Sequence, residues 1–270
     1  MTDISNNPEF DNLIFSIQEL ETELADLVFD RDRLLYHICP NLQAEYMLKI
    51  GKLEYAIFEY QCEILRTKRK IEIIQAFINR KQSYSIVEIE EQLEIEYQEY
   101  SRKLLEKQKE IEEARLKKSN RGRLLTDEEA TELKKLYTQI VKKLHPDINP
   151  NTTEEQHGQF IDAVNAYKNA DLTELRIIFL LLDKIFITDN ANTMEKLLSK
   201  KEELVKEKNF LTSEIFTIKG SFPYCIKDLL QDKNSLQNKI VELSDLLDSL
   251  KEQQKNIETR MESMLKSANE

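Results

Sequence analysis

The feature that most constrains the fold of this chain is a set of large apolar residues that recur at every seventh position near its C-terminus. One row consists of Leu229, Leu236, Leu243, Leu250, Ile257 and Met264. A companion row, offset by three or four positions, consists of Ile226, Ile240, Leu247 and Met261, interrupted by the polar Lys233 and Gln254. Two such rows form one apolar stripe along an α-helix, which is the pattern of a coiled coil.

The same spacing recurs earlier in the chain. The rows there are Phe10, Ile17, Leu24 and Ile38, interrupted by Arg31; Leu13, Leu20, Leu27 and Leu34; Ile50, Ile57, Ile64, Ile71 and Ile78; and Leu197, Leu204, Leu211 and Ile218. We predict that Pro40 breaks the first helix, because proline cannot donate a hydrogen bond inside a helix. A weaker break is expected at residues 82–85. Gly220 and Pro223 are helix-stop residues, so residues 190–267 are predicted to form a helical hairpin.

A shortage of turn-forming residues supports the helical interpretation. The 270 residues include only 4 glycines and 5 prolines, the two residue types that most often mark turns. A sandwich, a barrel or a doubly wound sheet needs many more turns. We therefore predict an all-α fold built from a few long helices.

Charge and cysteine content exclude several classes of protein. The formal net charge is −11, so the chain as a whole does not attract nucleic acid or an anionic membrane. The longest apolar run, Ile177–Leu182, is far shorter than the about 20 residues of a membrane span. No signal-peptide pattern is visible at the N-terminus, and Cys39, Cys62 and Cys225 lack paired spacing. We expect reduced thiols and a cytoplasmic location.

Between the predicted coiled coils lies a segment of different character. Residues 126–129, Thr-Asp-Glu-Glu, form a capping box that predicts a helix start. The helix then runs to Leu144 without an acidic residue after Leu133. One of its faces carries four lysines: Lys134, Lys135, Lys142 and Lys143. This face either meets an acidic partner or is an ordinary solvated helix surface.

A rigid loop follows that helix. It contains His145, Pro146 and Asp147, and Pro150 comes soon after. The prolines end the helix and favour an extended backbone. A second helix is predicted from about Thr153 or Glu154, and its apolar face is expected to consist of Phe160, Ile161, Ala163, Val164 and Tyr167. Two antiparallel helices joined by this loop form a specific arrangement.

These residues resemble the DnaJ J-domain. The pattern consists of Leu133, Tyr137, Ile140, Lys143 and Leu144, then His-Pro-Asp at 145–147 and Asn-Pro at 149–150, then Phe160, Ala163, Ala166 and Tyr167. The match covers about Thr126 to Ala170. The family's short first helix is not visible before Thr126, because a predicted coiled-coil segment precedes Thr126 instead.

The resemblance implies a co-chaperone that binds a DnaK-type heat-shock chaperone and stimulates its ATP hydrolysis. By that resemblance Asp147 would engage an arginine of the partner, and His145 and Pro146 would shape the loop. The four lysines would face an acidic surface of the partner. The J-domain core would consist of Leu133, Tyr137, Ile140, Phe160, Val164 and Tyr167. No enzymatic activity, cofactor or metal is implied, and His37 and His157 lack partners at metal-ligand spacing.

The predicted organisation is a J-domain-like hairpin inserted between long coiled-coil arms. We divide the chain into N-terminal coiled-coil helices (1–120), a J-domain-like helical domain (121–187) and a C-terminal coiled-coil hairpin (188–270). The arms would target the chaperone to a client or an assembly, and the C-terminal rows pair either within the chain or with a second copy.

Two other interpretations remain open at this point. In the first, the chain is a coiled-coil scaffold whose J-like hairpin is a packing element that stimulates no chaperone. In the second, residues 66–70 or 117–123 bind nucleic acid through their basic side chains. Acidic and apolar neighbours of residues 66–70 favour a solvated helix face there instead.

Overall fold

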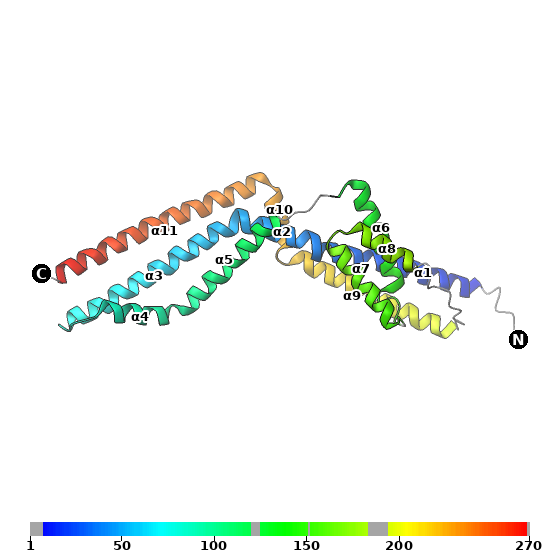
Figure 1. The fold of residues 1–270 in the computed structure, drawn as a ribbon, viewed down its shortest axis with the longest axis horizontal. Helices are drawn as coiled ribbons and strands as arrows, with labels where there is room; N and C mark the ends of the chain where they lie inside the picture. Colours follow the sequence, from blue (N-terminus) through cyan, green and yellow to red (C-terminus); the bar gives the residue numbers. More distant parts are fainter. Residues whose placement is uncertain (1–7, 120–124, 151, 183–193, 269–270) are drawn as a thin grey trace. The chain divides into compact units, whose positions relative to one another are not determined.

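The computed structural model describes residues 8–119, 125–150, 152–182 and 194–268, and these residues contain helices and connections but no strand (Figure 1). The all-α prediction is confirmed. The α-helices are α1 Pro8–Arg33, α2 Cys39–Tyr46, α3 Lys52–Asn79, α4 Ile86–Glu96, α5 Gln98–Ser119, α6 Asp127–Leu144, α7 Glu154–Lys168, α8 Leu172–Leu182, α9 Met194–Gly220, α10 Lys227–Gln231 and α11 Lys233–Ala268. The π-helical turns are η1 Leu34–Ile38 and η2 Met47–Gly51, and the 3-10 turn is η3 Tyr224–Ile226.

The chain folds into two compact units, each made of two separate stretches of sequence. The first unit combines Met1–Pro40 with Gly122–Cys225, and the second combines Asn41–Arg121 with Ile226–Glu270. Each unit therefore draws on more than one of the three consecutive ranges predicted from the sequence. The J-like segment shares its unit with α1 and α9.

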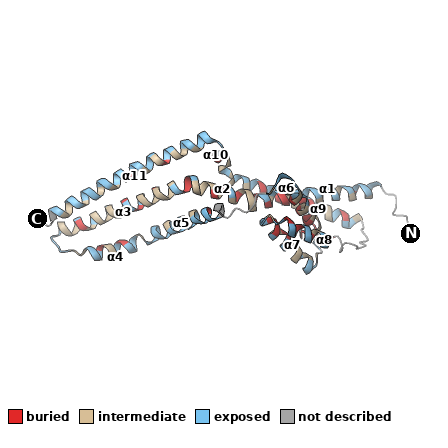
Figure 2. Ribbon diagram, turned by 45° about the horizontal axis from the view of Figure 1, so that its top comes forward, coloured by how far each residue is buried: buried red, intermediate tan, exposed pale blue. Residues whose placement is uncertain are grey.

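In the first unit, α1 is the central packing element. It contacts both α6 and α9, and α6 also contacts α7 and α8. Buried residues concentrate where these helices meet (Figure 2). Leu24 and Val28 of α1 and Leu204 of α9 are almost completely buried, and burying one such side chain contributes about 1.5–3 kcal/mol. Ion pairs join α9 to α1 at Lys200–Glu21 (2.7 Å) and Lys208–Glu23 (2.6 Å).

In the second unit, α11 packs along α3. The shared core joins Ile50, Ile57 and Ile64 to Leu243 and Leu250. The apolar rows of α9 and α11 were expected to face each other in a hairpin, but they pack on α1 and α3 instead. The C-terminal rows thus pair within the chain.

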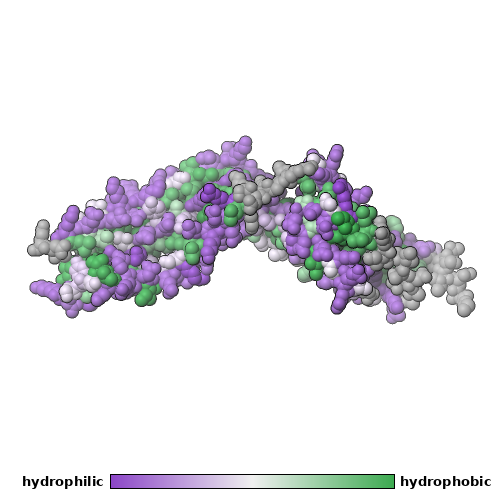
Figure 3. Space-filling view, viewed as in Figure 1, coloured by the Kyte–Doolittle hydropathy of each residue, from purple (hydrophilic) through white to green (hydrophobic). Residues whose placement is uncertain are grey.

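Shorter contacts complete the second unit. α4 packs on α3 through Ile74, Ile89 and Leu93, and α5 contacts α3 and η2. The predicted weak break at 82–85 is confirmed, because α3 ends at Asn79 and Ser85 caps the start of α4. On the face drawn in Figure 3 the surface of the unit is mainly hydrophilic.

The prediction that Pro40 breaks the helix is wrong. Pro40 lies inside α2, and every residue from Pro8 to Asn79 is helical. The turn just before it, η1, is π-helical, and the backbone N–H of Cys39 donates to the carbonyl of Leu34. This wider turn rearranges the hydrogen bonds next to the proline, which itself has no N–H to donate.

The predicted stop near Gly220 is confirmed, since α9 ends there. No glycine in the described residues has a positive φ, so α9 ends at Gly220 without the left-handed backbone that often caps a helix. Among the described residues, no helix is both long enough and apolar enough to cross a bilayer.

Candidate functional site

The J-like segment is organised by two well-capped helices. Thr126 accepts a hydrogen bond from the backbone N–H of Glu129 (3.2 Å), whose carboxylate accepts one from the N–H of Thr126 (2.9 Å). Thr153 and Gln156 form the same reciprocal pair at the start of α7, at 3.2 and 2.8 Å. Each box satisfies two N–H groups that a helix start otherwise leaves without a partner. Both helix starts agree with the sequence analysis.

The end of α7 carries backbone strain. Ala170 has a φ of 54°, and its N–H donates to the carbonyl of Tyr167 (3.0 Å). This left-handed conformation suits glycine better than alanine, because the Cβ atom crowds the backbone.

The loop between α6 and α7 is held at both of its ends. The N–H of His145 donates to the carbonyl of Val141 (2.9 Å), and the N–H of Asn149 donates to the carbonyl of His145 (2.8 Å). The side-chain amide of Asn149 donates to the carbonyl of Lys142 (2.7 Å). Ile148 is only 1% exposed and anchors the loop in the core. The loop therefore has a defined conformation.

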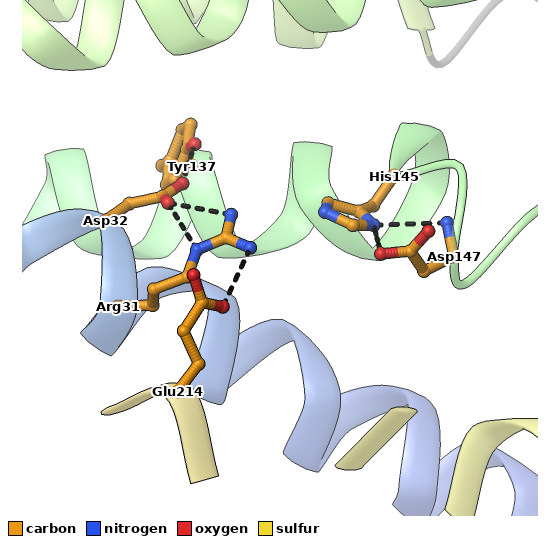
Figure 4. Close-up of polar contacts among 6 residues, drawn as sticks. All are labelled: Arg31, Asp32, Tyr137, His145, Asp147 and Glu214. Atoms are coloured by element: carbon orange, nitrogen blue, oxygen red, sulfur yellow. Dashed lines mark hydrogen bonds and ion pairs between the residues drawn. The ribbon is translucent and has the colours of Figure 1, made fainter. Parts of the chain in front are cut away.

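His145 and Asp147 form a local pair within this loop (Figure 4). His145 is 6% exposed, and its ring meets Phe160 edge-on at 5.1 Å between centroids. Its Nδ1 accepts a hydrogen bond from the N–H of Asp147 (3.2 Å) and lies 3.6 Å from the Asp147 carboxylate. Burial lowers the pKa of His145, and the Asp147 charge opposes that shift only in part.

Asp147 itself remains accessible. Its side chain is 47% exposed, whereas Pro146 beside it is half-buried. The carboxylate of Asp147 also contacts the carboxyl group of Glu207 in α9. Burial raises the pKa of Glu207, and the charge and hydrogen bond of Asp147 raise it further. Two carboxyl groups in contact repel each other when both are ionised. The loop tip is therefore locally acidic.

A buried polar network joins α1, α6 and α9, and it was not predicted from the sequence. Asp32 of α1 is 1% exposed, accepts a hydrogen bond from the hydroxyl of Tyr137 and is paired with Arg31 (2.8 Å). Arg31 also lies 3.8 Å from Glu214 of α9 (Figure 4). The one sequence signal was Arg31, which interrupts an apolar row of α1. Burial and then the Asp32 charge raise the pKa of Tyr137.

Aromatic contacts join α1, α6 and α7 around Tyr167. Its ring stacks on Tyr137 (4.1 Å, 14° between planes) and meets Phe29 edge-on (5.7 Å). His37 lies edge-on at 4.9 Å, and burial lowers its pKa. Of the expected core residues, the structure buries Leu133, Tyr137, Ile140 and Tyr167 and half-buries Phe160 and Val164. The prediction that Ile161 belongs to the apolar face of α7 is wrong, because its side chain is exposed.

The four lysines occupy a strip of α6 bordered by α1 and α8. Lys134 lies 4.0 Å from Asp26 and 5.0 Å from the centroid of the Phe29 ring. Lys142 donates to the hydroxyl of Thr22 (2.8 Å), and Lys143 lies over the ring of Phe179 (5.1 Å). Lys135 is exposed. Part of the expected partner face thus contacts the chain's own helices.

The basic cluster at residues 66–70 is largely paired with α4. Arg66 and Lys70 both bind Glu90 (2.7 and 2.5 Å), and Arg69 binds Glu96 (3.0 Å). These pairs favour a solvated, neutralised helix face. Residues 120–123 of the other basic segment lie outside the described residues. No group of three or more potential ligand side chains that could hold a metal occurs in the part of the chain that the structure describes.

Comparison with protein-family models, with curated proteins and with solved structures found no match to this chain.

Proposed function

We propose that the chain is a co-chaperone that is not itself an enzyme. In this proposal α6, the loop and α7 act as a J-domain-like antiparallel hairpin that binds a DnaK-type chaperone and stimulates its ATP hydrolysis. The observation that carries the proposal is Asp147, whose carboxylate is 47% exposed at the tip of an otherwise well-held loop. A carboxylate in a fixed position suits a charge-assisted contact with an arginine of the partner.

Packing within the hairpin supports the antiparallel arrangement. The ring of His145 meets Phe160 at the loop end, and Tyr137 stacks on Tyr167 further along. In addition, α1 packs against α6, and in this proposal it serves in place of the short first helix that is not visible before Thr126. The free cysteines Cys39, Cys62 and Cys225 agree with a reducing compartment, so we place this activity in the cytoplasm.

The test is single-turnover ATP hydrolysis by a DnaK-type chaperone, measured with and without the full chain. The wild type should accelerate hydrolysis, and Asp147→Asn should abolish the acceleration. The matched control is Asp162→Asn, which removes an exposed aspartate of α7 and should leave it unchanged. Absence of acceleration by the wild type, or equal acceleration by Asp147→Asn, would overturn the proposal.

The second candidate function is a coiled-coil scaffold in which the hairpin serves only for packing. It is favoured by a specific observation: His145 is buried, and Lys134 and Lys142 contact α1 rather than pointing freely into solvent. A scaffold of this kind gives no stimulation of any DnaK-type chaperone tested. In that case Asp147→Asn would change neither ATP hydrolysis nor the assembly in which the chain takes part.

A further inference from the structure

A surface pocket of about 450 Å³ opens in the first unit between α1, α6, α8 and the loop after α6. It is lined by Glu21, Gln139, Lys142, Lys143, Asn149 and Phe179. This volume lies within the range of pockets that hold small ligands or single side chains of a partner. Neither Asp147 nor His145 belongs to it.

The pocket brings two ammonium groups close to two side-chain amides. The Lys142 ammonium is positioned by its hydrogen bond to Thr22 (2.8 Å). Asn149 is positioned by its own bond to the carbonyl of Lys142 (2.7 Å), which uses one of the two N–H bonds of its amide. Groups of this kind are donors, and donors held in place recognise anionic oxygen atoms.

The remaining walls differ in chemistry. The Phe179 ring supplies an apolar surface, and the Lys143 ammonium lies over it at 5.1 Å from the centroid. The carboxylate of Glu21 is directed to Lys200 of α9, at 2.7 Å. The ligand therefore needs an anionic group and an apolar group a short distance apart.

We propose that this pocket binds an acidic peptide segment. One carboxylate lies between Lys142 and Lys143, and a neighbouring apolar side chain packs on Phe179. A peptide segment supplies a carboxylate and an apolar side chain at the short spacing that Lys142, Lys143 and Phe179 require. A nucleic acid would instead bring a long row of phosphates to a chain whose net charge is −11. The site shares Lys142 and Lys143 with the four-lysine face that the J-domain resemblance assigns to an acidic partner surface, and it deepens that assignment by adding an apolar contact on Phe179. It uses neither residue of the His145–Asp147 pair, so the peptide titration and the chaperone assay can fail separately.

The experiment is a binding titration of the full chain with a fluorescent, end-blocked peptide that alternates glutamate with leucine. Binding should weaken as salt is added. Lys142→Gln and Lys143→Gln should each raise the Kd about tenfold, since each removes one charge-assisted contact. The matched control is Lys135→Gln, an exposed lysine of the same helix that does not line the pocket; it should change the Kd less than about twofold.

Two further measurements keep the proposal falsifiable if a lysine variant folds poorly. In the wild type, the side-chain amide resonances of Gln139 and Asn149 should shift when the peptide is added. A peptide with glutamine in place of glutamate should bind at least about tenfold more weakly. Equal binding of the two peptides, equal weakening by Lys135→Gln, or unshifted amide resonances would overturn the proposal. Asp147→Asn should leave peptide binding unchanged, which separates this result from the chaperone assay.

Discussion

The hydroxyl of Tyr137 donates a hydrogen bond to the carboxylate of Asp32, a residue 105 positions earlier in the chain. Both residues are almost completely buried. The bond joins α1 to α6, and Arg31 completes the pairing of the carboxylate. A buried charge is tolerated only when it is paired and hydrogen-bonded, so this contact ties the N-terminal helix to the candidate site.

We expect Tyr137→Phe to destabilise the first unit by about 1–3 kcal/mol, because Asp32 loses a partner in a buried site. Urea denaturation measures the loss. The control is Tyr55→Phe, which removes a hydroxyl bonded to Glu59 in a less buried setting and should cost less. A double-mutant cycle with Asp32→Asn should give a coupling of at least about 0.5 kcal/mol; additive effects would mean that the bond contributes nothing.

We expect the stability of the first unit to fall in mild acid. Burial lowers the pKa of both His37 and His145, so both are neutral in the folded state and gain protons more readily when unfolded. The stability that these two neutral histidines contribute is fully present above their unfolded-state pKa of about 6.5. It is lost as the pH falls through their lower folded-state pKa. For His145 the Asp147 charge opposes this loss, whereas Arg31 adds to it.

The measurement is the urea midpoint as a function of pH for the wild type and for His145→Gln. The variant should show a smaller loss between about pH 7 and pH 5, even if it is less stable at neutral pH. Unchanged pH dependence in both His145→Gln and His37→Gln would contradict the assignment of neutral histidines.

The two capping boxes predict that removing either threonine hydroxyl lowers the stability of the protein by a similar amount. Thr126→Ala and Thr153→Ala should each cost about 1 kcal/mol, because each leaves a helix N–H without its partner. Thr131→Ala is the control, since Thr131 is exposed and bonds only to a carbonyl within α6; its effect should be within about 0.5 kcal/mol. Thermal unfolding compares the three variants, and a Thr131 effect as large as the others would argue against the caps.

Ala170 provides a prediction of increased stability. Replacing it by glycine relieves a left-handed backbone at a φ of 54°, and we expect Ala170→Gly to stabilise the protein by up to about 1 kcal/mol. Ala163→Gly, in the buried interior of α7, should instead destabilise it. If both variants destabilise by the same amount, the strain at Ala170 is not relieved by glycine.

Replacing Pro40 by alanine tests whether the helix continues through this position or breaks there. Because residues around Pro40 are already helical, Pro40→Ala should leave the helix content seen by circular dichroism unchanged. Stability should rise, by no more than about 3 kcal/mol, as the N–H of residue 40 becomes available. A clear gain in helix content would indicate that the chain is not helical at this position.

Much of the local structure could be predicted from the sequence. The capping residues Thr126 and Thr153 are short-range signals, and each depends only on a residue three positions away. The apolar face of α6 follows from its helical periodicity, so Leu133, Tyr137 and Ile140 could be placed in the core. The helix through Pro40 could not be predicted in this way. A proline favours a helix break, and the π-helical turn η1 that lets the helix continue has no recognisable local pattern in the sequence.

The sequence by itself determined that the chain is helical, where α6 and α7 begin, and that a loop with two prolines carries Asp147 between them. Tertiary structure alone decided which helix packs on which. The apolar rows of α1, α3, α9 and α11 are chemically alike, so any two could pair by hydrophobic burial. The pairing of α9 with α1 is accompanied by contacts between distant residues, such as the ion pairs of Lys200 with Glu21 and of Lys208 with Glu23. No local pattern encodes such contacts, because each requires the surrounding helices to be in place.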